Sequence, residues 1–80
     1  MTAVQGSMNK LLSRSPLVFS KREYQVDLWD NGAMVVHRQG SAICVASLQD
    51  GTWGLTGGKV ALFRAAVRSV GGTVCEETIG

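Results

Sequence analysis

Three turns that contain glycine divide the middle of the chain and do most to limit its fold. The turns Asp30-Asn31-Gly32, Gln39-Gly40 and Gln49-Asp50-Gly51 separate runs rich in apolar residues. Asn-Gly is a strong hairpin signal, because a type I′ turn needs positive φ at both central residues. The spacing predicts strands at about 23–29, 33–38, 41–48 and 52–55, connected as an antiparallel meander.

The apolar period changes to that of a helix after Gly57-Gly58. Apolar side chains recur there every three or four residues, Arg64 and Arg68 lie opposite them, and Gly71-Gly72 is a stop signal. The pattern predicts a helix at 59–70 that packs on the sheet through Val60, Phe63, Val67 and Val70. Residues 73–79 are rich in β-formers and predict a final strand that joins the sheet.

The N-terminal segment is predicted to be peripheral. Ser7 is placed to cap a short helical turn through Met8, Leu11 and Leu12, and Pro16 ends it because proline cannot continue a helix. Residues 17–19 then favour an extended conformation. With 80 residues, the chain is long enough for one hydrophobic core, so we expect a single domain over 1–80, with 1–16 mobile or peripheral.

The fold class predicted by these elements is α+β. A small antiparallel sheet carries one main helix on one face, with a short N-terminal helical or extended segment. A two-residue turn at Asn31-Gly32 would pair Trp29 with Met34 and Leu28 with Val35. The face expected to take the helix is almost wholly apolar and comprises Tyr24, Val26, Leu28, Ala33, Val35, His37, Ala42, Cys44, Ala46 and Leu48.

The second face of the predicted sheet has a polar frame around five apolar side chains, namely Trp29, Met34, Val36, Ile43 and Val45. Two interpretations remain open. The N-terminal apolar residues Leu11, Leu12, Leu17, Val18 and Phe19 fold over this face, or part of it stays exposed as a surface for a partner or a second copy of the chain.

The chemistry-bearing residues do not predict an enzyme or a cofactor. His37 is the single histidine, and it shares the predicted core face with Cys44, which favours packing over a nucleophile pair. With the two cysteines it makes three potential zinc ligands where a structural site uses four. No run of eighteen apolar residues and no signal-peptide pattern occurs in the sequence, so we expect a cytoplasmic protein that does not span a membrane.

A non-catalytic, protein-binding role is therefore the predicted function. Tryptophan and arginine are enriched where interfaces carry most of their energy. The candidate contact residues are the five apolar side chains of the second face and three arginines. They are Trp29, Met34, Val36, Arg38, Ile43, Val45, Arg64 and Arg68. The alternative is a small nucleic-acid-binding accessory protein that uses its basic residues, although a formal net charge of +2 is low for a duplex binder.

In size, compactness, lack of catalytic groups and strand-rich layout with one main helix, the chain resembles the small phage-encoded anti-CRISPR proteins. The resemblance covers the outline of the whole chain, and no residue role is carried over from it. It implies a stoichiometric inhibitor that covers a functional surface of a large CRISPR-Cas or similar defence complex in the cytoplasm of a bacterial host.

Overall fold

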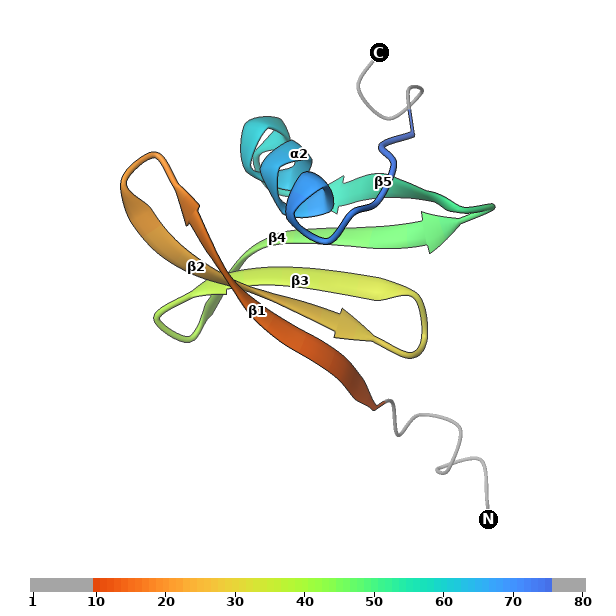
Figure 1. The fold of residues 1–80 in the computed structure, drawn as a ribbon, viewed down its shortest axis with the longest axis horizontal. Coiled ribbons are helices and arrows are strands. Elements are labelled where there is room, and N and C mark those ends of the chain that lie inside the picture. Colours follow the sequence, from red (N-terminus) through yellow and green to blue (C-terminus); the bar gives the residue numbers. More distant parts are fainter. Residues whose placement is uncertain (1–9, 76–80) are drawn as a thin grey trace.

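The computed structural model describes residues 10–75, which form one antiparallel sheet and one helix (Figure 1). The strands are β1 (Leu11–Phe19), β2 (Arg22–Trp29), β3 (Ala33–Arg38), β4 (Ser41–Gln49) and β5 (Thr52–Gly57), and the helix is α2 (Val60–Ser69). Neighbours in sequence are neighbours in the sheet, in the order β1-β2-β3-β4-β5. The predicted α+β class with a small antiparallel meander is confirmed.

Strand β1 replaces the helical turn predicted near the N-terminus. Leu11 and Leu12 are extended, and β1 pairs with β2 through a two-residue turn at Ser20 and Lys21. Proline is tolerated in β1 because β1 is an edge strand, in which the N–H groups directed away from β2 have no ladder partner. Ser7 and Met8, the predicted start of the turn, lie outside the described residues.

The turn between β2 and β3 differs from the predicted one and changes the register. Only Gly32 has positive φ, at 86°, and its N–H donates to the Trp29 carbonyl at 3.1 Å. The Asn31 side chain accepts a hydrogen bond from the N–H of Ala33. The loop therefore has three residues, Asp30 to Gly32, rather than two, and Leu28 pairs with Met34 instead of Val35.

A one-residue shift reverses which face each side chain of β3 occupies. Met34 and Val36, predicted on the second face, are fully buried in the core, whereas Val35 and His37 are directed to the opposite face. The turn at Gln39-Gly40 has positive φ at both residues and pairs Arg38 with Ser41, as predicted. A bulge then leaves Ile43 unpaired and brings Val36 opposite Cys44.

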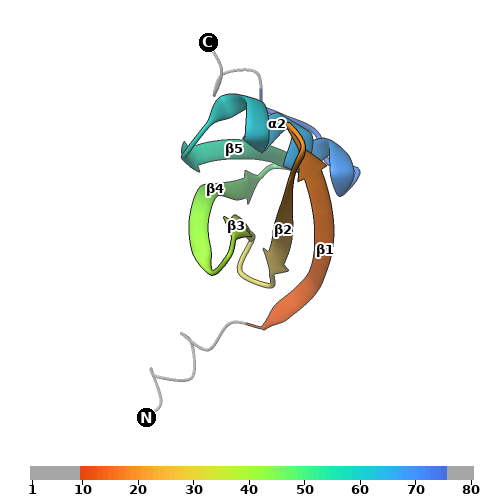
Figure 2. The ribbon, with the colours of Figure 1, turned by 90° about the vertical axis from the view of Figure 1, so that its left-hand side faces the viewer.

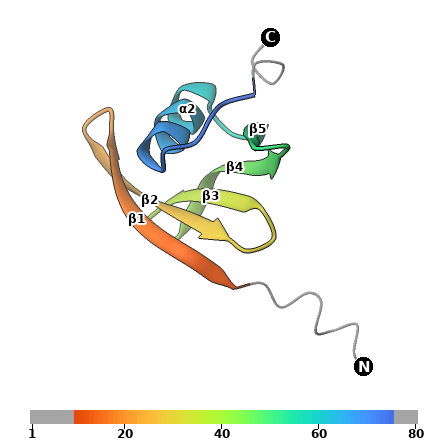
Figure 3. The ribbon, with the colours of Figure 1, turned by 45° about the vertical axis from the view of Figure 1, so that its right-hand side comes forward.

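The sheet curves strongly, and α2 covers its concave face between the two edge strands (Figure 2). Phe63 and Val67 are buried there as predicted, together with Leu62 and Ala66, and Val70 packs at the margin. Val60 is exposed instead, so the buried side of the helix is centred on Phe63 and Val67. Leu17 and Phe19 pack against this same core, which means that β1 does not cover the outer face. Figure 3 shows α2 on one side of the sheet.

The helix ends at the predicted glycines. Gly71 has positive φ and Gly72 donates its N–H to the Val67 carbonyl at 2.9 Å, as in a Schellman cap. The chain then returns to β5, where Trp53 and Val74 form a parallel bridge. The predicted final strand is reduced to this bridge within the described residues, and 76–79 lie outside them.

Candidate functional site

No described element covers the outer face of the sheet, opposite α2 (Figures 1 and 3). Apolar side chains form a patch on this face. Leu11 pairs with Trp29 across β1 and β2, and Val35 pairs with Val45 across β3 and β4. None of these four side chains belongs to the hydrophobic core or packs against it. We call Leu11, Trp29, Val35 and Val45 the outer patch. Its three inner members are half-buried and Leu11 is 39% exposed.

A buried carboxylate lies in the middle of the outer face. Asp27 is only 3% exposed, and it accepts two hydrogen bonds from Arg14, from Nε at 2.8 Å and from Nη2 at 2.9 Å. A third contact joins Asp27 Oδ2 to His37 Nε2 at 2.9 Å. Because an ionised carboxylate only accepts, Nε2 carries the hydrogen. Side chains from β1, β2 and β3 are thereby joined at one point.

The position of these residues follows from the strand pairing. Arg14 is directly opposite Asp27, and His37 is opposite Gln25, one diagonal step away. The hydrogen bonds from Arg14 hold the pKa of Asp27 below its usual value, against the opposing effect of burial, and the contact with His37 lowers the pKa further. The network satisfies the buried carboxylate and stiffens the sheet beneath the outer patch.

The residues predicted to contact a partner do not form one surface. Trp29 and Val45 lie in the outer patch, but Met34 and Val36 are inaccessible beneath α2, and Ile43 packs against the core. Arg38 lies at the end of β3, and the exposed Arg64 and Arg68 lie on the helix. The prediction is therefore wrong for Met34 and Val36, since the β3 register was misassigned by one residue.

Val35 and the Asp27 network were missed by sequence reasoning, and Leu11 was considered only as a cover for the second face. The alternating pattern of residues in β2 and β3 indicated which side chains of one strand share a face. To match the faces of the two strands, the length of the turn between them had to be known. Arg14 and Asp27 are thirteen residues apart, and no local pattern relates them.

The two side chains considered for nucleophilic chemistry are separated by the sheet. Cys44 is buried in the core, where burial raises the pKa of its thiol, whereas His37 is on the outer face. A raised pKa disfavours the reactive thiolate. Within residues 10–75, no three His, Cys, Asp or Glu side chains are grouped so that they could hold a metal ion.

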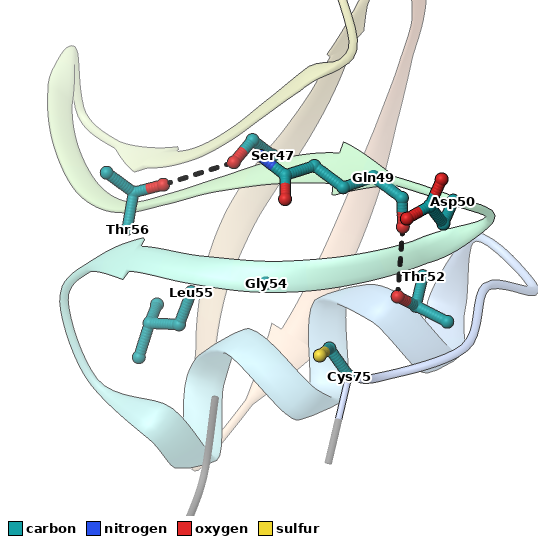
Figure 4. A pocket seen from close by; sticks show the side chains of 8 residues that line it. All are labelled: Ser47, Gln49, Asp50, Thr52, Gly54, Leu55, Thr56 and Cys75. Atoms are coloured by element: carbon teal, nitrogen blue, oxygen red, sulfur yellow. Dashed lines mark hydrogen bonds between the residues drawn. The ribbon is translucent and has the colours of Figure 1, made fainter. Parts of the chain in front are cut away.

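A polar pocket of about 440 Å³ lies between β4, β5 and Cys75 (Figure 4). Its hydroxyl groups already have local partners: Thr52 Oγ1 donates to the Gln49 carbonyl at 3.1 Å, and Ser47 and Thr56 oxygens are 3.5 Å apart. These bonds stabilise the β4–β5 hairpin. Asp50 is the one charged residue among those that line the pocket, so it offers little to a charged ligand.

Comparisons of the chain with protein-family models, with curated proteins and with solved structures give no match. No helix among the described residues is long and apolar enough to cross a membrane.

Proposed function

We propose that the protein is a non-catalytic binding module that uses the outer patch to bind a protein partner. The observation that carries the proposal is Trp29, a half-buried tryptophan on a sheet face that no element within residues 10–75 covers. Buried aromatic anchors supply much of the energy of protein interfaces. The apolar neighbours Val35 and Val45 provide the surrounding area, and Leu11 extends it across to the edge strand.

The rigidity of the face supports this role. Asp27 ties three strands together, and Arg14, half exposed, lies over it at the border of the patch. Binding to a preformed surface costs less conformational entropy than ordering a loose one. An apolar centre with a preformed polar border suits a protein surface that is apolar in the middle and polar at its margin.

The resemblance to anti-CRISPR proteins gives the proposal its most specific form. The partner is then a CRISPR-Cas or similar bacterial defence complex, and inhibition occurs by covering one of its functional surfaces. Titration of purified effector complexes, with target cleavage or target binding as the readout, tests this form. Stoichiometric inhibition with an end point set by the complex concentration supports it, and no inhibition across the effector classes contradicts it.

Trp29→Ala tests the patch itself. An anchor of this kind contributes about 2 kcal/mol or more, so the variant should bind its partner roughly thirtyfold more weakly. Leu48→Ala is the control, because Leu48 is an apolar side chain that is accessible, at 44% exposed, but lies outside the patch. Equal binding by folded Trp29→Ala and wild type refutes the outer patch as the binding surface.

Light scattering after gel filtration tests whether the partner of the outer patch is a second copy of this chain or a different protein. A dimer that dissociates on dilution and is lost in Trp29→Ala would make the chain its own partner. A monomer at all concentrations leaves the face for another protein.

A further inference from the structure

A groove separate from the outer patch opens where two hairpins diverge. The β2–β3 ladder ends at the Gln25–His37 pair. Beyond it, the β1–β2 hairpin continues to the Ser20-Lys21 turn and the β3–β4 hairpin to Gln39-Gly40, and Figure 1 shows the two ends pointing apart. The groove between them has a volume of about 910 Å³.

The charge in the groove is mainly positive. Lys21, Arg22 and Arg38 line it, together with one carboxylate, Glu23. The ion pairs within residues 10–75 are those of Asp27 with Arg14 and His37, so none of the three groove cations is engaged in one. Cations on two opposing hairpins that form no ion pair with a described residue are suited to a ligand with repeated negative charges.

An aromatic ring completes the groove. Tyr24 lines it, and the ring packs edge-on against Phe19, with centroids 6.4 Å apart and planes at 62°. Phe19 in turn packs on the core. Tyr24 is thus held in place while its exposed side remains part of the groove. A fixed aromatic beside several cations is the arrangement by which proteins stack single-stranded bases and hold their phosphates.

The turn at the rim of the groove carries a lysine where glycine would be less strained. Ser20 and Lys21 both have positive φ, at 54° and 65°, although neither is glycine. A two-residue type I′ hairpin turn requires positive φ at both positions, and a residue other than glycine costs about 1 kcal/mol or more there. Glycine at position 21 would relieve the strain but would remove the cation from the rim of the groove.

We propose that this groove is a binding site for single-stranded nucleic acid, with Lys21, Arg22 and Arg38 on the phosphates and Tyr24 stacked on a base. Three cations are too few for a duplex footprint, and a base within a duplex is not free to stack on Tyr24. The site does not depend on the outer patch, which lies elsewhere on the sheet.

Fluorescence anisotropy with a labelled oligothymidine between about 50 and 300 mM salt tests the site. Three phosphate contacts predict that log K falls against log salt with a slope of about −2, from roughly −0.7 per contact. Lys21→Gln and Arg22→Gln should each reduce the steepness by about 0.7. Arg64→Gln removes the same charge from an exposed helical position outside the groove and should leave the slope unchanged.

Tyr24→Leu tests stacking and should weaken binding about 5- to 150-fold. Since Tyr24 also packs on the core, the melting curve of the Tyr24→Leu variant is measured first. If that variant is unstable, Lys21→Gln and Arg22→Gln still test the site. A labelled polyglutamate and a duplex serve as competitors. No binding at tens of micromolar, equal competition by polyglutamate, or an equal effect of Arg64→Gln overturns the proposal, whereas Trp29→Ala bears only on the outer patch.

Discussion

Phe63→Ala is the sharpest test of how the helix is attached to the sheet. Phe63 is fully buried at the centre of the concave face, among the side chains of α2 and the strands. Removing a buried phenyl ring loses its transfer free energy and leaves a cavity, at a cost of about 3–5 kcal/mol. A domain of this length has roughly 4–12 kcal/mol of stability in total, so the variant should be close to unfolding.

Urea denaturation followed by tryptophan fluorescence measures this loss, because Trp53 is buried against the same core. The midpoint should fall strongly at an unchanged slope. Arg64→Ala, one position further along the helix and exposed, is the control and should change the stability by less than about 0.5 kcal/mol. A loss below about 1 kcal/mol for Phe63→Ala would show that the helix does not pack through this residue.

The remaining predictions concern the buried carboxylate and one glycine. Asp27 has a pKa below that of the unfolded chain, about 3.9, so its contribution to stability is complete above about pH 5 and is lost as the pH falls through 3.9 and then through the folded value. Asp27→Asn should reduce the fall in urea midpoint between pH 5 and pH 2.5, and an unchanged acid profile would contradict this. Gly58→Ala should cost about 3 kcal/mol or more, since φ is 111° and an added Cβ would lie 2.5 Å from the Ile43 carbonyl oxygen and 2.7 Å from Cys44 Cα. Gly40→Ala, with φ of 84° and no atom within 4 Å of the added Cβ, should cost only about 1 kcal/mol, and equal melting temperatures for the two variants would refute the steric explanation.

The elements with strong local signals were predictable. The glycine turns marked β2 to β5 to within two residues, and the 3.6-residue period marked α2. Strand β1 was not predicted because its turn, Ser20-Lys21, contains no glycine or asparagine, although both residues have positive φ. The short apolar run of β1, which contains a proline, has no strong local preference for helix or strand. It becomes a strand because it pairs with β2.

The register of the first hairpin depended on a choice that the local sequence left open. Asp30-Asn31-Gly32 is compatible with a two-residue or a three-residue loop, and the two choices exchange the faces of β3. The observed loop buries Met34 and Val36 under the helix and leaves His37 beside Asp27. A two-residue loop would have directed the Met34 side chain away from the core and placed the smaller Val35 side chain there instead.

The sequence by itself determined the class of the fold, the number of turns in its central part and the helix, because these depend on residues close together in the chain. Tertiary structure decided which residues come together in each candidate site, although Trp29 and Val45 had been named from the sequence. The outer patch combines residues of four strands, and the groove combines the ends of two hairpins that diverge after the Gln25–His37 pair. Such sites arise from strand register and sheet curvature, which are set by the packing of the whole core rather than by any local preference.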